Sequence, residues 1–409
     1  MTAKKFFVSF IIFLYLNTNV LGQSGCPTTY SNTAIKANVI STAAGSVDSC
    51  CALCQQNSAC AAYKWNSTSG GTCFLLDDYQ PLYVSNGETV GVTTPSSANA
   101  YVLTKSYDSS NWLNDDTFSY ANSNGDFTVY VDKNTATSKG LVKTQNGKVY
   151  VGMDNTTVLP WNDTSVKGRD AVRLNSISTY NAGLFILNLD HMPTGPGVLT
   201  EFWMSGPNWP NEGEIDILQG PANKNFNTIT LHTDEGCTMQ VSDNIYFTGS
   251  WEIQNNKPGA NCWNNAPGQY AYAGCGIEAP NNTFNTGFNQ AGGGVFAMEW
   301  NREKFIRIWN FVQPNVPADI VQNNPSPNPA TWGMPTAYFT IGPNCTADHF
   351  QTQTMTLMVD LCPSWGYFPG GACECHNHAS FAPYEYSEAY WLINYLKVFC
   401  KNGQNCISS

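Results

Sequence analysis

The chain has 409 residues, and its 30 acidic residues outnumber its 19 basic residues to give a formal net charge of −11. This balance argues against nucleic acid as a partner, because nucleic-acid binding needs a basic surface, and it argues equally against an anionic membrane surface. Only 12% of the residues are charged. Asparagine, serine, threonine, glycine and aromatic residues take their place, a composition that suits neutral polar ligands such as sugars and also the solvated surface of an exported protein.

The N-terminus predicts an export signal at residues 1–22. Two lysines precede the apolar run Phe6 to Leu16, and small residues at Val20 and Gly22 precede a predicted cleavage before Gln23. At about eleven residues the run is too short to span a bilayer, which needs roughly 20. We therefore expect a secreted protein, extracellular or associated with a cell wall, without a membrane span.

Cysteines and glycosylation acceptor sites agree with an oxidising compartment. The sequence holds 15 cysteines, which favours disulfide bonds in an exported chain. It also holds asparagines in the pattern Asn-x-Ser/Thr, which marks glycoproteins of the secretory route. These are Asn66, Asn155, Asn162, Asn281 and Asn344.

Residues 23–106 are expected to form a small unit that depends on disulfides. Its cysteines crowd between Cys26 and Cys73, and so short a segment cannot bury much core, so bridges must supply its stability. The stretch Val47 to Gln56 has modest helical character, while Ala61–Trp65 and Cys73–Leu76 predict short strands around a Ser/Gly turn. A zinc site is the alternative, which the exported context disfavours.

The cysteine pattern of this unit resembles the PAN/apple module. The run Cys50-Cys51-Ala-Leu-Cys54 is followed by Cys60 and Cys73. The resemblance implies a helix pinned to a small sheet through Cys54–Cys60 and through one of Cys50 and Cys51 with Cys73, although many pairings are compatible with the sequence. Such modules usually bind proteins or carbohydrates. The unit is therefore expected either to tether the larger domain to a cell-wall carbohydrate or protein, or to be a structural appendage.

Residues 107–409 predict an antiparallel β-sandwich or barrel. The boundary lies near Tyr107, after a Ser/Thr/Pro-rich stretch at 93–98 and a predicted strand at 100–104. Helical periodicity is nearly absent, and short apolar or alternating runs recur between Gly, Pro and Asn turns. The runs are Gly183–Leu189, Val198–Met204, Glu214–Leu218, Thr228–His232, Gly294–Trp300, Phe305–Val312, Met355–Leu361 and Tyr390–Phe399.

The most informative stretch is 209–220, which reads WPNEGEIDILQG. Successive side chains of a strand face opposite sides, so Glu212, Glu214 and Asp216 should share one face. Carboxylates lined up in this way suit glycoside chemistry, in which two carboxyl groups flank the scissile bond. The alternative is an exposed acidic edge strand that deters aggregation, which the interleaved isoleucines disfavour. Leu218 breaks the alternation, and a β-bulge there would return residue 219 to the acidic face.

The sequence GEIDILQG at 213–220 resembles the catalytic strand of glycoside hydrolase family 16, whose pattern is Glu-x-Asp-x-x-Glu with such a bulge. Other stretches match the family in the expected order along nearly the whole domain. They are Gly168–Arg173, Leu189–Pro193, Glu201–Trp203, Leu231–Thr233, Gly293–Trp300 and Ile393–Val398. The motifs are most similar to fungal-type laminarinases, which are endo-β-1,3(4)-glucanases. The resemblance implies a mainly β fold, a concanavalin-like β-jelly-roll sandwich, whose concave sheet holds a β-1,3- or mixed-linkage glucan.

The resemblance also implies residue roles. Glu214 matches the nucleophile of a retaining mechanism, and Asp216 matches the residue that tunes the ionisation of the catalytic glutamates. Further residues match cleft positions that stack on sugar rings or hydrogen-bond to them, with core packing as the alternative for each tryptophan. They are Trp203, Trp209, His232 and Trp365.

The chain departs from the family at Gln219, where the general acid/base glutamate belongs. An amide cannot protonate a departing glycosidic oxygen, and general acid–base catalysis is typically worth about 10²–10⁴-fold, or roughly 3–5.5 kcal/mol of barrier. Three interpretations follow: an enzyme with a rescued mechanism, for example through Glu212, a catalytically inactive lectin-like glucan binder, or a wall-interaction protein. The retained Glu214 and Asp216 favour sugar recognition over the third.

The larger domain holds nine cysteines between Cys237 and Cys406, so one must stay unpaired or pair between molecules. The run Cys373-Glu-Cys375-His376-Asn-His378 superficially resembles a metal cluster. Its spacing is unusual for structural zinc, and disulfides are favoured over a metal. The sequence implies no organic cofactor and no catalytic metal, and it leaves a structural calcium ion open.

Overall fold

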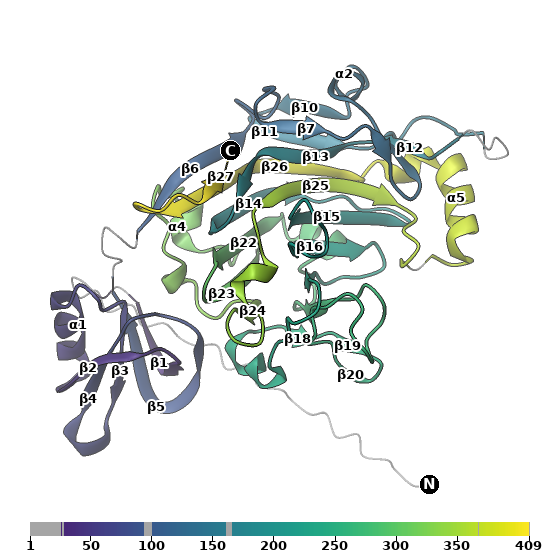
Figure 1. Ribbon diagram of the computed structural model, residues 1–409. Coiled ribbons are helices and arrows are strands. Elements are labelled where there is room, and N and C mark those ends of the chain that lie inside the picture. Colours follow the sequence, from purple (N-terminus) through teal and green to yellow (C-terminus); the bar gives the residue numbers. More distant parts are fainter. Residues whose placement is uncertain (1–25, 27, 94–99, 161–165, 367, 409) are drawn as a thin grey trace, which may run out of the picture. The chain divides into compact units, whose positions relative to one another are not determined.

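The computed structural model describes residues 26, 28–93, 100–160, 166–366 and 368–408 (Figure 1). The chain divides into two compact units, Met1–Thr94 and Pro95–Ser409. The predicted signal peptide at 1–22, its cleavage site before Gln23 and the acceptor Asn162 lie outside the described residues. Among the residues that are described, no helix is long and apolar enough to cross a membrane.

The smaller unit is an antiparallel sheet against which a helix packs. Its strands are β1 (Thr28–Ile35), β2 (Val39–Ala44), β3 (Ala62–Asn66), β4 (Thr72–Leu76) and β5 (Leu82–Val92), in the order β1-β5-β3-β4-β2. Helix α1 (Val47–Gln56) contacts β3 and β4. It begins after Ser46, whose side chain accepts a hydrogen bond from the N–H of Ser49 and so satisfies a donor of the first turn. The turn between β3 and β4 holds the short helix η1 (Thr68–Gly70).

Disulfides tie α1 of the smaller unit to its surroundings. The bridges are Cys26–Cys51, Cys50–Cys73 and Cys54–Cys60. The predicted pair Cys54–Cys60 is confirmed, and of the two candidates for Cys73 the structure selects Cys50. Cys51 turns instead toward Cys26, because neighbouring residues of a helix point in different directions. The core cluster at these bridges holds five of their cysteines together with Tyr63 and Leu75.

The larger unit is built on two sheets. The strands of the first sheet are β6 (Tyr101–Asp108), β10 (Val142–Gln145), β11 (Lys148–Gly152), β14 (Gly183–His191), β22 (Gly294–Asn301), β23 (Phe305–Val312), β24 (Ala337–Thr340) and β26 (Tyr390–Lys401). They follow the order β10-β11-β26-β14-β22-β23-β24, and β6 pairs with β26.

The second sheet carries the acidic stretch. Its strands are β7 (Phe118–Tyr120), β13 (Arg173–Tyr180), β15 (Val198–Ser205), β16 (Glu214–Pro221), β17 (Thr228–His232), β18 (Ser250–Trp251), β21 (Cys275–Glu278), β25 (Gln353–Leu361) and β27 (Ile407–Ser408). They follow the order β18-β21-β17-β16-β15-β25-β13-β27, and β7 pairs with β13. The acidic strand β16 therefore lies between β17 and β15, inside the sheet and not at its edge.

The two sheets of the larger unit pack on each other as a sandwich. Strand β16 contacts β22 of the other sheet, and Figure 1 shows the long strands of both sheets running in similar directions, as in aligned sheet packing. Residues on the inner faces, such as Ile215, Phe202 and Met298, are almost fully buried. Each such side chain gains roughly 1.5–3 kcal/mol from leaving water, so the inner faces fix which side of β16 can hold polar residues.

The remaining elements cover the edges of the larger unit. A small sheet holds β8 (Ser123–Asn124), β9 (Thr128–Tyr130) and β12 (Arg169–Ala171), and a hairpin holds β19 (Ile253–Gln254) and β20 (Lys257–Pro258). The α-helices are α2 (Lys133–Ser138), α3 (Asn285–Gln290), α4 (Ala318–Val321) and α5 (Gly371–Phe381). The 3₁₀ helices are η2 (Val241–Tyr246), η3 (Pro329–Thr331), η4 (Ala347–His349) and η5 (Pro383–Tyr386).

The division between the units differs from the sequence prediction. The strand that we placed before the boundary near Tyr107 is β6, which pairs along β26 of the larger unit. Its Tyr101 hydroxyl donates to the buried carboxylate of Glu299, at 2.8 Å, and Glu299 pairs with the buried Arg307. The structure thus divides the chain at Thr94, before β6, because the partner of β6 lies far along the sequence, where local patterns give no sign of it.

Disulfides also account for all but one of the described cysteines of the larger unit. The bridges are Cys237–Cys345, Cys262–Cys275, Cys362–Cys375 and Cys400–Cys406. Among the described residues, the free cysteine is Cys373, which is exposed. Cys375, the neighbour that suggested a metal cluster, is engaged in its bridge.

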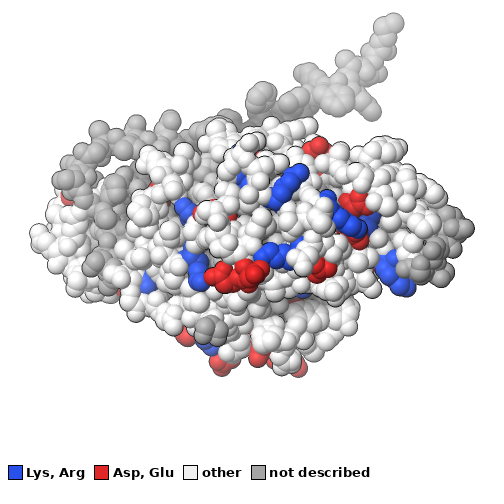
Figure 2. All heavy atoms as spheres, turned by 90° about the horizontal axis from the view of Figure 1, so that it is seen from above, with Lys and Arg blue, Asp and Glu red and all other residues white. Residues whose placement is uncertain are grey.

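Charged residues are sparse on the face drawn in Figure 2, where acidic and basic side chains lie scattered among uncharged ones. This agrees with a chain in which 12% of residues are charged.

Candidate active site

A β-bulge in β16 brings Gln219 to the face of Glu214 and Asp216. Two adjacent residues of β15, Trp203 and Phe202, lie opposite Asp216 and Leu218 of β16, respectively. Ile217, between Asp216 and Leu218, is therefore an extra residue in β16. The register with β17 shifts over the same stretch. Because one extra residue reverses the alternation, Gln219 faces the same side as Glu214. The predicted bulge is confirmed.

Glu212 does not belong to this face, and its prediction there was wrong. Strand β16 begins at Glu214, and Gly213 before it has a φ of 81°, a left-handed conformation that turns the chain. The Glu212 carboxylate accepts a hydrogen bond from the N–H of Asn208, at 2.9 Å, and its carbonyl accepts one from the Gln353 amide, at 2.6 Å. Glu212 thus closes the preceding turn.

Glu214 lines a cavity of about 430 Å³ together with Trp203 and Trp209. The indole Nε1–H of Trp209 donates a hydrogen bond to the Glu214 carboxylate. Burial and the negative charge of Asp216 raise the pKa of Glu214 to about 8, against the opposing effects of His232 and Trp209. Ionising the Glu214 carboxyl group therefore costs free energy, and the Trp209 indole N–H is placed to stabilise the ionised form.

Asp216 and His232 form a buried pair beside Glu214. Asp216 is completely buried, and His232 Nε2 lies 3.2 Å from its Oδ2. The other ring nitrogen, Nδ1, lies 2.8 Å from Oδ1 of Asn264. Burial alone would lower the pKa of His232, but the hydrogen bond to Asp216 and the charges of Glu214 and Asp216 raise it to about 9. A doubly protonated ring donates a hydrogen bond to Asn264 and forms an ion pair with Asp216, which offsets part of the negative charge.

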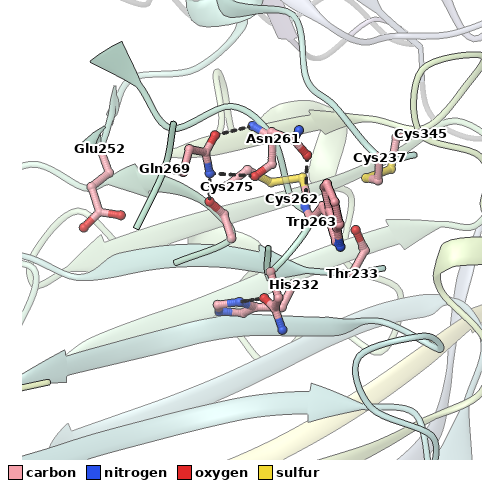
Figure 3. Close-up of a disulfide and its surroundings, with 12 residues drawn as sticks. His232, Thr233, Cys237, Glu252, Asn261, Cys262, Trp263, Gln269, Cys275 and Cys345 are labelled. Carbon is pink, nitrogen blue, oxygen red and sulfur yellow. Dashed lines mark hydrogen bonds between the residues drawn. A yellow bond between two sulfur atoms is a disulfide. The ribbon is translucent and has the colours of Figure 1, made fainter. Parts of the chain in front are cut away.

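A disulfide-bonded loop places Asn264 against His232. The buried bridge Cys262–Cys275 closes the loop at its base, and Figure 3 shows His232 below this bridge. Within the loop, the Gln269 side chain accepts from the N–H of Asn261, at 2.9 Å, and donates to its carbonyl, at 2.8 Å (Figure 3). The disulfide and these hydrogen bonds thus hold the loop in place, and they fix the position of Asn264, the partner of His232 Nδ1.

Gln219 lines a second cavity, of about 650 Å³, which also includes His232 and Trp365. Its Nε2 donates a hydrogen bond to Oε1 of Glu201, at 3.1 Å. Glu201 lies directly across from Gln219 on β15 and is 7% exposed. Burial and the charges of Asp216 and Glu214 raise the pKa of Glu201 well above its usual range.

Sequence reasoning missed the contact of Glu201 with Gln219. Glu201 was matched as the start of a family stretch, and its partner lies on another strand. A glutamate two residues before Trp203, in an apolar strand, was the signal that could have identified it.

The aromatic residues predicted for the site line the cavities. Trp203 is half-buried and stacks with the Arg173 guanidinium, 5.1 Å from the ring centroid. Trp209 is 46% exposed and Trp365 is 55% exposed, so core packing does not explain either ring. Trp209 also stacks on Tyr272, with 6.4 Å between ring centroids. The structure places Trp203 and Trp209 with Glu214, and Trp365 with Gln219.

Comparisons with known families match both units. A model described as the XgeA-like, catalytic GH16 domain matches residues 116–399. A PAN domain model matches residues 26–94.

Several curated fungal proteins are similar to the chain. A probable glycosidase of Schizosaccharomyces pombe is 34% identical over 313 residues, covering 74% of this chain and 70% of that protein. An endo-1,3(4)-beta-glucanase of Arthroderma benhamiae is 33% identical over 318 residues, covering 73% and 65%. A probable endo-1,3(4)-beta-glucanase of Aspergillus niger is 33% identical over 320 residues, and the matched part spans only 41% of that relative.

Solved structures resemble the larger unit. Laminarinase 16A from Phanerochaete chrysosporium, a GH16 protein solved with β-glucans in donor and acceptor sites, has a TM-score of 0.66 and 30% identity, covering 74% of this chain and 100% of that chain. An elongating GH family 16 β-1,3-glucosyltransferase has a TM-score of 0.65 and 31% identity, covering 73% and 100%.

Proposed function

The chain belongs to glycoside hydrolase family 16, with a PAN domain before its jelly roll, and from this membership we propose that it binds β-1,3- or mixed-linkage glucan and hydrolyses it slowly. The observation that carries the proposal is the common face of β16. On this face Glu214 borders one cavity and Gln219 borders another. A sugar chain across both would place one glycosidic bond between the two side chains.

In the proposed reaction the ionised Glu214 attacks the anomeric carbon and forms a glycosyl ester, which water later hydrolyses with retention of configuration. The Trp209 indole N–H supports the ionised carboxylate. The protonated His232 ring, paired with Asp216, supplies a positive charge that favours the ionised form of Glu214. Glu214 therefore has the surroundings of a nucleophile, although burial keeps much of it protonated at neutral pH.

Gln219 makes slow turnover the expected outcome. Its amide carries no acidic proton for the leaving oxygen, and loss of general acid catalysis costs about 10²–10⁴-fold. The same feature supports the second candidate function, a lectin-like protein that binds glucan without cleaving it. Both functions use the same cavities, and they differ only in turnover.

The test combines a reducing-sugar assay on laminarin and lichenan with a pull-down on insoluble β-1,3-glucan. We expect the wild-type chain to bind and to release sugar slowly. Gln219→Glu should raise the rate by about 100-fold or more, because it supplies a carboxyl group at the leaving-group side. Glu214→Gln should abolish release while the protein still binds.

The outcomes separate the candidate functions. Binding without any release in the wild-type chain would establish the lectin-like function. Rapid wild-type release that Gln219→Glu leaves unchanged would refute the proposed role of position 219. Failure of both binding and release would refute glucan recognition and favour a wall-interaction protein.

We further propose that the protein is a secreted glycoprotein whose PAN domain holds a cell-wall carbohydrate or protein ligand. Its disulfides support an oxidising compartment, and the acceptor residues Asn281 and Asn344 are exposed. Detection of the protein in culture medium, with a mass decrease on treatment with an N-glycan-removing amidase, would test this.

A further inference from the structure

Glu201 is a buried acid that the assigned roles leave unused. It projects from β15 toward the same face as Glu214, since Glu201 pairs with Gln219 and Ser205 pairs with Glu214 across the strands. Its Oε1 lies 3.1 Å from Gln219 Nε2. A carboxyl oxygen thus lies one hydrogen bond behind the amide that occupies the general acid position.

The surroundings of Glu201 keep its proton in place. Asp216 and Glu214 approach it from β16, and Asp360 approaches it from β25. The phenol of Tyr130 is also near. Among the described residues no cation forms an ion pair with Glu201, and the protonated His232 is paired with Asp216. A buried carboxyl group among acidic neighbours stays neutral, so Glu201 can donate a proton.

Another glutamate at the second cavity lacks this property. Glu252 lines the same cavity as Gln219, but it lies 4.0 Å from the Lys224 ammonium group. It also accepts a hydrogen bond from the Gln254 amide, at 3.1 Å. Glu252 therefore faces a cation and an amide donor, whereas acidic groups surround Glu201.

We propose that Glu201 is the proton donor and acceptor of this chain, and that Gln219 covers it until a glucan is bound. This assignment rests on the proposed function, because it names the group that donates the proton in the proposed slow hydrolysis. Gln219 is half-buried at the cavity wall, so rotation about its side-chain bonds, at the cost of one hydrogen bond, uncovers the Glu201 carboxyl group.

The proposed steps balance in protons and bonds. As the Glu214 carboxylate forms its bond to the anomeric carbon, the bond from that carbon to the leaving oxygen breaks, and the Glu201 proton moves to that oxygen. Glu201 is then a carboxylate. A water molecule next attacks the anomeric carbon, the ester bond to Glu214 breaks, and the water proton returns to Glu201.

The test compares substrates that do and do not need an acid. Laminarin has a poor leaving group, whereas a 2,4-dinitrophenyl β-laminaribioside leaves without protonation. Glu201→Gln keeps the size and neutral charge of the buried group, and should lose about 100-fold or more on laminarin. Ester formation from the aryl glycoside, measured as the burst of dinitrophenol, should change by less than about tenfold. Added azide should yield a β-glycosyl azide with Glu201→Gln.

Two further variants separate catalysis from structure. Gln219→Ala removes the cover and leaves Glu201 in place, so laminarin turnover should increase, and a decrease would overturn the proposal. Glu303→Gln, an exposed change in the turn between β22 and β23 that lines neither cavity, should leave both substrates unaffected. Thermal melting and glucan pull-down show whether each variant is folded.

The results distinguish this proposal from the proposed function. If the wild-type chain releases sugar through Glu214 but Glu201→Gln does not slow laminarin release, this proposal is overturned and the proposed function stands. An equal loss on both substrates would also overturn it, since a structural role predicts that result. Binding without wild-type release overturns it as well, whereas absence of binding overturns the proposed function itself.

Discussion

Glu214 and His232 each hold a proton more tightly in the folded chain than in the unfolded one. Burial and Asp216 raise the pKa of Glu214 to about 8, and the hydrogen bond to Asp216 helps to raise that of His232 to about 9 against the effect of burial. At pH values above the ordinary pKa of glutamate, the folded state therefore binds more protons than the unfolded state. By linkage, stability must fall as pH rises through this window.

We predict that Glu214→Gln flattens this pH dependence. In the wild-type chain the Glu214 proton makes the unfolding free energy fall by up to about 1.4 kcal/mol per pH unit between roughly pH 5 and 8. The amide has no proton to lose, so the variant should lose less stability over that range. Urea unfolding at several pH values measures the difference, with Glu303→Gln as the control. Parallel curves for wild type and Glu214→Gln would contradict the raised pKa.

Residues on one strand could be predicted from the sequence, and their partners could not. Alternation and a broken pattern at Leu218 sufficed to place Glu214 and Gln219 on one face. The contact between Glu201 and Gln219 depends on which strands are neighbours, and Asn264 reaches the site from a loop. Glu212 misled the prediction because alternation was extended across Gly213, where the backbone turns.

At the scale of elements, the loop closed by Cys262–Cys275 contributes to the stability of the fold and also positions residues of the candidate site. It carries the Asn264 partner of His232 and the exposed Tyr272 of the second cavity. Cys400–Cys406 closes a shorter loop at the chain end, whose residues do not line either cleft cavity. The two bridges therefore offer a matched comparison.

We predict that replacing Cys262 and Cys275 by alanine costs about 3 kcal/mol of unfolding free energy, as expected for a loop of this size. Glucan affinity should also fall, because Asn264 and Tyr272 lose their fixed positions. The corresponding double alanine variant of Cys400 and Cys406 should lose stability but keep its affinity. Denaturant unfolding and glucan binding isotherms measure the two effects. Equal affinities in both variants would show that the loop does not shape the site.

Strands with compact apolar runs could be located closely from the sequence. The predicted run Thr228–His232 is β17, and Phe305–Val312 is β23, without any change of bounds. Strand β13 was not identified, because Arg173–Tyr180 alternates polar side chains with few apolar ones. Strand β6 was placed in the wrong unit, since its pairing with β26 joins distant parts of the chain.

At the scale of the whole molecule, β6 decides where the larger unit begins. We predict that a fragment of residues 95–409 folds and keeps the glucan binding of the full chain. A fragment of residues 107–409 loses Tyr101, so the buried Glu299 and Arg307 pair loses a hydrogen-bond donor and nearby core contacts. Its unfolding free energy should be lower by at least about 3 kcal/mol. Calorimetry of both fragments measures this, and equal melting temperatures would contradict the assignment of β6.

The paired cavities of the larger unit have a consequence for the polymer itself. Under the proposed function, glucose units would occupy the cavity at Glu214 and the cavity at Gln219, before and after the bond that is cut, so the glucan need not present a terminus. A few cuts near the middle of long molecules shorten their average length sharply. A glucan solution treated with this protein would therefore thin long before oligosaccharides accumulate.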